Sequence, residues 1–115
     1  MKMTNAEAYG SLGVMQELKE KGVLGFAVAK NMRKLADELQ EYDSKRNECI
    51  RKYGTLIEGE RYSFSGEAAE KFYAEMEPYD RIEFEFEPMT VSEETFCGSN
   101  LTSDQMAVLM WMVKE

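Results

Sequence analysis

The sequence predicts an α+β fold in which a long helix or helical hairpin arm joins a small sheet of two or three strands. Apolar residues recur at helical spacing over residues 25–53, a strictly alternating segment follows residue 81, and an apolar segment closes the chain. With 115 residues, 43% of them hydrophobic, the chain suits one domain with its own core. We divide this domain into a helical arm over residues 1–54 and an α+β lobe over residues 55–115.

A first helix is predicted over residues 5–21. Thr4 and Glu7 have the spacing of a capping box, apolar residues then recur every three or four positions, and Gly22 ends the segment. Two glycines inside this helix each weaken it by roughly 1 kcal/mol relative to alanine, so we expect it to depend on packing.

A second helix is predicted from Gly25 to Tyr53, a rod roughly 43 Å long. Its apolar seam consists of Val28, Met32, Leu35, Leu39, Tyr42, Arg46, Cys49 and Tyr53, and Arg46 is the one charged member. One small core cannot cover every side of such a rod. We therefore expect part of the seam to meet another subunit, or the first helix folded back as a hairpin.

The pattern changes to β after Gly54, where Tyr62 and Phe64 alternate with polar residues. A crossover helix follows, with Ser65 at its start and Pro78 at its end. The clearest strand comes next, in "RIEFEFEPMT", which places aromatic and aliphatic side chains on one face and glutamates on the other. The order strand, helix, strand favours a small βαβ unit, with antiparallel pairing as the alternative.

The last helix begins at a second capping box, formed by Thr102 and Gln105. The segment "MAVLMWMV" that follows is apolar all around the helix, so it is either buried on several sides or part of a subunit interface. We expect a homo-oligomer built through this helix and the long one. The interface candidates are Met32, Leu35, Leu39, Met106, Leu109, Met110, Trp111 and Val113.

From the second helix onward, four segments have a familiar pattern: "VAKNMRKLADEL", "YDSKRNECIRKYG", the alternating acidic strand and "LTSDQMAVLMWMVKE". Over most of the chain this pattern resembles a family of small uncharacterised proteins, a domain of unknown function, encoded by tailed phages of Gram-positive bacteria. The resemblance implies a phage or prophage origin and brings no established activity.

The net charge of −8 is unevenly distributed. Residues 24–53 carry seven basic and five acidic side chains, whereas residues 54–115 carry four and fourteen. Such acidity repels nucleic acid, so no direct binding to it is expected. The glutamates at 83, 85 and 87 instead offer a ladder that imitates a phosphate backbone.

The sequence also lacks the features that are typical of metal-binding, secreted and membrane-spanning proteins. The chain has no histidine, and Cys49 and Cys97 lie far apart, so we expect neither a metal site nor a cofactor. The N-terminus does not resemble a signal peptide, and the longest apolar run is too short to cross a bilayer. We expect a cytoplasmic protein, in the host cell if it is phage-encoded.

Arg46 has two interpretations, because a buried, unpaired guanidinium costs several kcal/mol. Either it forms an ion pair with a glutamate or aspartate of a neighbouring element, or it lines a site for a phosphate or carboxylate ligand. The candidate ligand-binding residues are Arg46, Tyr42, Arg51, Lys52 and Tyr53. A weaker anion site is formed by Lys30, Arg33 and Lys34.

No nucleophile with an evident neighbouring base occurs in the sequence, so we do not expect an enzyme. The leading hypothesis is a phage accessory protein, active in counter-defence, that binds and sequesters an anionic signalling nucleotide in an oligomer. The alternatives are an inhibitor that binds a host protein, including an acidic DNA mimic, and a phage assembly factor.

Overall fold

A computed structural model describes residues 1–57 and 61–115 and confirms the α+β class: the chain is mostly helical and has two small antiparallel sheets. The elements are β1 (Lys2–Thr4), α1 (Asn5–Gln16), α2 (Gly22–Glu38), α3 (Gln40–Tyr53), β2 (Thr55–Ile57), β3 (Arg61–Ser63), α4 (Gly66–Asp80), β4 (Glu83–Glu85), α5 (Glu93–Cys97), α6 (Ser103–Leu109) and the 3₁₀ turn η1 (Met110–Met112).

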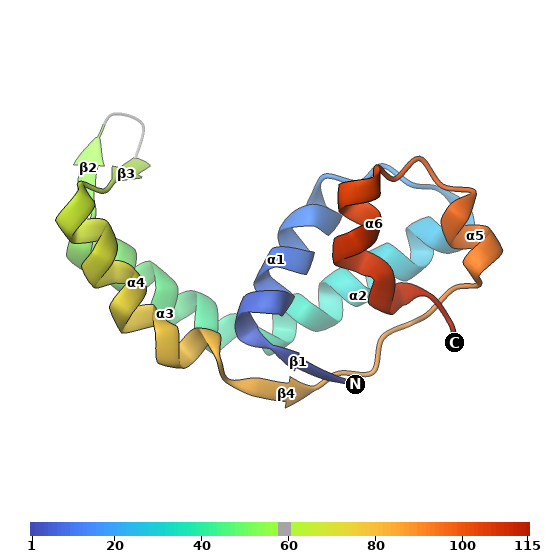
Figure 1. Cartoon of the computed structure of the whole chain (residues 1–115), viewed down its shortest axis with the longest axis horizontal. Helices are drawn as coiled ribbons and strands as arrows, with labels where there is room; N and C mark the ends of the chain where they lie inside the picture. Colours follow the sequence, from blue (N-terminus) through green and yellow to red (C-terminus); the bar gives the residue numbers. More distant parts are fainter. Residues whose placement is uncertain (58–60) are drawn as a thin grey trace.

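The molecule is V-shaped (Figure 1). Helices α3 and α4 form an arm with β2 and β3 at its tip, and α1, α2, α5 and α6 form the lobe. The radius of gyration is 16.2 Å, against about 13 Å for a compact domain of this length. The projecting arm is thus built from α3, α4 and the strands β2 and β3, and not from residues 1–54 as the sequence division had it, because α3 packs along α4.

The prediction of one continuous helix over residues 25–53 is wrong. The helix begins at Gly22, whose φ of 66° is a left-handed conformation that favours glycine, and it is interrupted at Leu39, where ψ is 5°. The Leu39 amide still donates to the Leu35 carbonyl at 2.9 Å, so the interruption is a bend between α2 and α3. Because of the bend, the α2 part of the apolar seam packs on α1 and the α3 part packs on α4.

The lobe core forms where α1 folds back on α2, which is the hairpin alternative for the seam. Helix α1 ends at Gln16, earlier than the predicted residue 21. Leu35 and Leu39 have no exposed surface within the single chain, and neither does Leu109 of α6. These three interface candidates are therefore core residues. Met110 is exposed, and the other four candidates, Met32, Met106, Trp111 and Val113, are half-buried.

The predicted βαβ unit is wrong, because each strand finds a different antiparallel neighbour. Strand β3 pairs with β2, and β4 pairs with β1, where Met3 lies opposite Phe84. Strand β1 was not expected from the sequence. Helix α4 runs to Asp80 and includes Pro78, which was predicted to end it. Its 15 residues separate the strands on either side by roughly 22 Å, too far for the two to pair.

Two of the three predicted N-terminal caps form, those of Thr4 and Thr102, whereas Ser65 stands at the start of α4 without a side-chain capping hydrogen bond. The Thr4 hydroxyl accepts from the Glu7 amide at 3.1 Å, and Thr102 and Gln105 form a complete capping box. Gly54 ends α3 where the chain turns back. A Cβ atom there would lie 2.6 Å from the Ile50 carbonyl oxygen and 2.9 Å from the Cβ of Tyr62, so this close approach requires glycine.

Candidate functional site

Arg46 lies where α1, α3 and α4 meet, at the base of the V. Its guanidinium carbon is 4.6 Å from the centre of the Tyr9 ring and 5.3 Å from the centre of the Phe72 ring. Its Nε atom is buried and has no hydrogen-bond acceptor, and no ion pair joins Arg46 to a carboxylate in residues 1–57 and 61–115. Two aromatic rings therefore hold Arg46, in place of the predicted ion pair.

Tyr42, the candidate residue one turn before Arg46 on α3, already has a hydrogen-bond partner. The Tyr42 hydroxyl donates to the Asp80 carboxylate at 2.5 Å, and the Tyr42 ring packs edge-on against Tyr9. Burial raises the pKa of Tyr42, the hydrogen bond to Asp80 raises it further, and the Arg46 charge opposes part of the rise. The Tyr42 hydroxyl therefore stays protonated at neutral pH, and its hydrogen bond holds Asp80, the last residue of α4, against α3.

A pocket of about 370 Å³ opens between α1 and α3 beside this group. It is lined by Tyr9, Leu12, Gly13, Gln16, Asp43 and Asn47. Tyr9 belongs to both features, since one side of its ring contacts Arg46 and the residue is also part of the pocket wall. The amides of Gln16 and Asn47 both donate and accept, while Asp43 accepts. The pocket therefore offers hydrogen-bonding groups and one aromatic wall.

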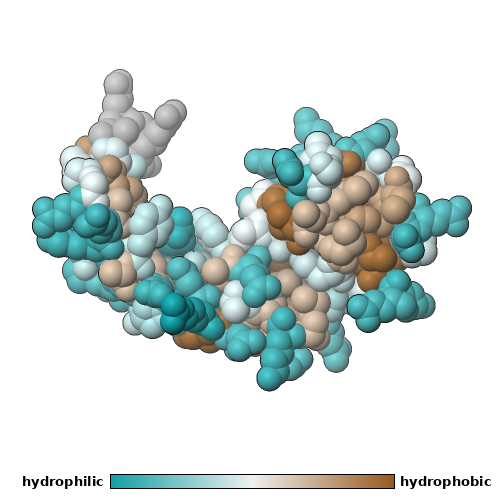
Figure 2. Space-filling view, viewed as in Figure 1, coloured by the Kyte–Doolittle hydropathy of each residue, from teal (hydrophilic) through white to brown (hydrophobic). Residues whose placement is uncertain are grey.

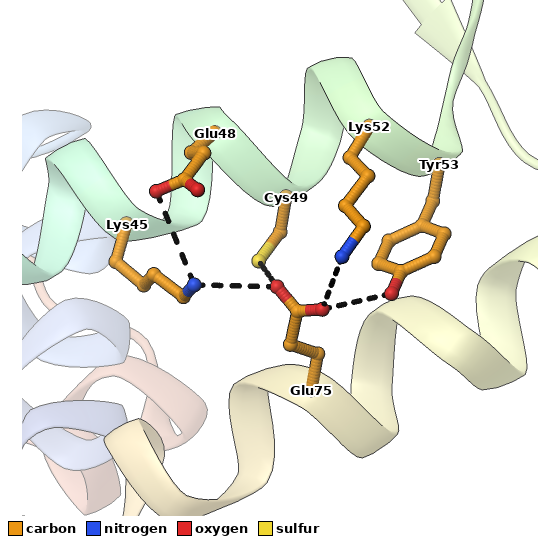
Figure 3. Close-up of polar contacts among 6 residues, drawn as sticks. All are labelled: Lys45, Glu48, Cys49, Lys52, Tyr53 and Glu75. Atoms are coloured by element: carbon orange, nitrogen blue, oxygen red, sulfur yellow. Dashed lines mark hydrogen bonds and ion pairs between the residues drawn. The ribbon is translucent and has the colours of Figure 1, made fainter.

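Two of the predicted ligand contacts face a different residue, Glu75 of α4 (Figure 3). The Glu75 carboxylate accepts from Lys52 Nζ at 2.9 Å and from the Tyr53 hydroxyl at 2.8 Å. Cys49 Sγ donates to it at 2.9 Å, and Lys45 Nζ lies 3.3 Å away. The structure therefore does not bring Lys52 and Tyr53 together with Arg46. We call these five residues the Glu75 cluster.

The charges of the Glu75 cluster stabilise one another. Hydrogen bonds from Cys49, Lys52 and Tyr53 hold the pKa of Glu75 well below its usual range. Hydrogen bonding to Glu75 in turn raises the pKa of Lys52 and of Lys45. Burial, followed by the hydrogen bond to Glu75, raises the pKa of Cys49 to about 11. The cluster thus binds α3 to α4 and keeps its thiol protonated at neutral pH.

Glu75 was not identified from the sequence, although the spacing of the α3 residues that face it is recognisable. Lys45, Cys49, Lys52 and Tyr53 are spaced so that they share one face of α3, which indicates a polar partner opposite that face. Nothing in the spacing singles out Glu75 among the many acidic residues after position 54, because the choice depends on how α4 lies against α3.

The thiols are expected to differ sharply in reactivity. Cys49 is fully buried with a raised pKa, whereas Cys97 is exposed. A disulfide-exchange reagent at pH 7.5 should therefore modify one thiol per folded chain and two after denaturation, because the thiolate is the reacting form. Equal rates for both thiols in the folded protein would contradict the buried position of Cys49.

The remaining candidates lie apart from Arg46. Arg51 is exposed on α3. On α2, Lys30 Nζ lies 6.0 Å from the centre of the Phe26 ring, and Lys34 Nζ donates to the Glu87 carbonyl at 3.0 Å. Lys30 and Arg33, two of the three residues of the weaker anion site, line a shallow depression of about 300 Å³.

The acidic ladder is accessible, since the glutamates at 83, 85 and 87 are all exposed around β4.

Within the described part of the chain, no three side chains of metal-ligating type gather into a metal site. No helix there has the length and apolar character needed to cross a membrane. No protein family, curated protein or solved structure matches this chain.

Proposed function

We propose that the protein is a non-enzymatic binding protein that captures an anionic nucleotide at Arg46. The observation that carries this proposal is the buried Nε atom of Arg46, which has no hydrogen-bond acceptor in residues 1–57 and 61–115. The Tyr9 and Phe72 rings attract its charge but cannot accept its hydrogen bonds. A guanidinium offers donors in a planar fork that matches a phosphate or carboxylate in two-point contact, so an anionic ligand would supply the missing acceptors.

The neighbouring pocket favours a nucleotide over a simple anion. Tyr9 is 38% exposed and can stack on a base. Asp43 can accept from a sugar hydroxyl or an exocyclic amine, and the Asn47 amide can both donate and accept. Asp43 would repel an isolated phosphate, so the ligand needs hydrogen-bond donors as well as its negative charge. The overall acidity of the protein also favours a small ligand over a nucleic acid.

Binding without chemistry is proposed because the chain has no histidine and the Cys49 thiol is held protonated. Under the resemblance to phage proteins, such binding would sequester a signalling nucleotide of the host cytoplasm and so counter a defence that depends on it. Native mass spectrometry of the purified protein, with and without an extract of cells in which such a defence is active, would identify the nucleotide. A mass unchanged by every extract would oppose sequestration.

Replacing Arg46 with methionine is expected to weaken nucleotide binding by about 10- to 100-fold, since charge-assisted hydrogen bonds contribute roughly 1.5–3 kcal/mol. Methionine preserves the apolar contact with the two rings. Isothermal titration calorimetry with linear and cyclic nucleotides measures the loss. Arg81→Met, which removes an exposed arginine at the end of α4, is the matched control and should bind like the unmodified protein.

A second variant keeps this test decisive if Arg46→Met fails to fold. Gly13 lines the pocket, and a Cβ atom there would meet no atom within 4 Å, so we expect Gly13→Leu to fold and to narrow the pocket. It should block the nucleotide. Full binding by a folded Gly13→Leu or Arg46→Met variant would refute the site.

The exposed acidic ladder favours one alternative, an inhibitor that imitates DNA and binds a host protein. Alternate residues of a strand lie about 7 Å apart on one face, so Glu83 and Glu85 of β4 present two neighbouring charges, and the exposed Glu87 follows just after the strand. Reversing these three charges to lysine should abolish capture of a DNA-binding partner in this case and leave nucleotide affinity unchanged. Arg46→Met should have the opposite pattern.

A further inference from the structure

Helix α2 presents an apolar and basic surface that the lobe does not use. Phe26 is 60% exposed and Val23 63% exposed. Lys30 lies over the Phe26 ring, and Arg33 is one turn further along the helix. The buried residues of α2 are Leu24, Ala27, Val28, Asn31 and Leu35, on the opposite side of the helix. We call the exposed residues Val23, Phe26, Lys30 and Arg33 the α2 ridge.

The lobe has an apolar groove between α1 and the C-terminal segment. The groove has a volume of about 490 Å³ and is lined by Met3, Ala6, Glu7, Gly10, Ser11, Val14, Val108 and Trp111. Gly10 leaves space in the wall, because a Cβ there would have no atom within 4 Å. Hydrophobic colour gathers over α6 in Figure 2. We call this feature the α1–α6 groove.

The two surfaces have opposite charge. Glu7 is the one charged residue that lines the α1–α6 groove in the described part of the chain. The depression on the α2 ridge is lined by two cations, Lys30 and Arg33, and by no anion. Both surfaces also expose large apolar side chains, and buried aromatic anchors are typical of the centre of a protein interface.

We propose that the α2 ridge of one copy of this chain binds in the α1–α6 groove of a second copy. Phe26 would enter the groove, and Lys30 would approach Glu7. Pairing of ridge with ridge would instead bring the cations of the two copies together. This inference does not depend on the proposed nucleotide site, since Arg46 belongs to neither surface.

The placement of the two surfaces determines the type of assembly. In Figure 1, α6 lies at the front of the lobe and α2 lies behind it. The groove is lined by residues of α1 and of the C-terminal segment, whereas the ridge residues lie on the side of α2 away from its buried residues. A contact between different surfaces on opposite sides of a subunit is heterologous, and such contacts produce rings or filaments rather than a two-fold dimer. Association should therefore extend beyond two subunits.

Mixing two variants tests this pairing. Gly10→Arg places a bulky cation in the groove, and Phe26→Glu removes the anchor and reverses the charge of the ridge. Each variant alone should be monomeric by light scattering after size-exclusion chromatography, at concentrations where the unmodified protein forms larger species. The mixture should form a one-to-one pair and nothing larger, because one intact ridge meets one intact groove.

Several outcomes would overturn the proposal. They are a monomeric unmodified protein at millimolar concentration, a mixture that stays monomeric, and either variant associating like the unmodified chain. If circular dichroism shows Gly10→Arg unfolded, Glu7→Lys and Lys30→Glu replace the first pair. Each should weaken association, and their mixture should associate about tenfold more tightly than either alone, since the opposite charges are restored across the contact. A mixture no tighter than its components would also refute the pairing.

Discussion

Replacing Asn31 with alanine is expected to lower the free energy of unfolding by about 2–4 kcal/mol, as two half-buried backbone groups of Met89 would lose their partners. Asn31 has no exposed surface, its Nδ2 donates to the Met89 carbonyl at 2.9 Å, and its Oδ1 accepts from the Met89 amide at 2.8 Å. This pair joins α2 to the segment that returns from the arm to the C-terminal part of the lobe. Urea unfolding followed by circular dichroism measures the change.

Lys34→Ala is the matched control for Asn31→Ala. Lys34 lies on the same helix and donates to Glu87 of the same returning segment, but its hydrogen bond is exposed. Water replaces such a bond, so the control should change stability by less than about 0.5 kcal/mol. If Asn31→Ala and the Lys34→Ala control unfold at the same urea concentration, the hydrogen bonds between Asn31 and Met89 do not hold this segment.

Replacing Glu75 with glutamine is expected to loosen the arm and to change the dependence of stability on pH. Four side chains of α3 depend on the Glu75 carboxylate. Because the pKa of Glu75 is lowered in the folded protein, its contribution is present above its ordinary pKa of 4.5 and is lost as the pH falls through the lower folded value. The variant should therefore unfold at lower temperature near pH 7.

The pH series is the decisive measurement for Glu75→Gln. Below pH 4.5 the unfolded chain protonates Glu75 before the folded protein does, so stability falls with falling pH, and the variant lacks this part of the slope. Melting temperatures of the two proteins should converge from pH 4.5 downward. Glu67→Gln is the control, since Glu67 pairs with Lys71 on the surface of the same helix. Parallel curves for Glu75→Gln and the unmodified protein would show that the carboxylate charge contributes nothing.

The Glu75 cluster also bears on the proposed ligand site. Arg46 belongs to α3, whereas Phe72, one of its two rings, belongs to α4. The cluster joins these two helices close to the Arg46 contact, since Cys49 is one turn from Arg46 and Glu75 is one turn from Phe72. We therefore expect Glu75→Gln to weaken nucleotide binding indirectly and by less than Arg46→Met, with the larger effect at higher temperature as the arm loosens.

Sequence patterns predicted two helix caps of this chain correctly. Thr4 and Thr102 cap helices because a hydroxyl at that position meets a free amide of its own first turn, which needs no distant contact. The α+β class followed similarly from apolar spacing over residues 25–53 and alternation near β4. The predicted continuous rod failed at Leu39, where the bend allows the seam to meet α1 and α4 in turn.

The sequence by itself determined where α1, α4 and α6 begin, which faces are apolar, and that Arg46 is the one charged residue of an apolar seam. Only the tertiary structure decided what those faces meet. It paired β4 with β1 across more than 75 residues, placed Glu75 opposite four side chains of α3, and set Arg46 between Tyr9 and Phe72. The physical reason is that caps and periodicity depend on residues within one or two turns, whereas strand partners, charge partners and stacked rings depend on how whole elements pack.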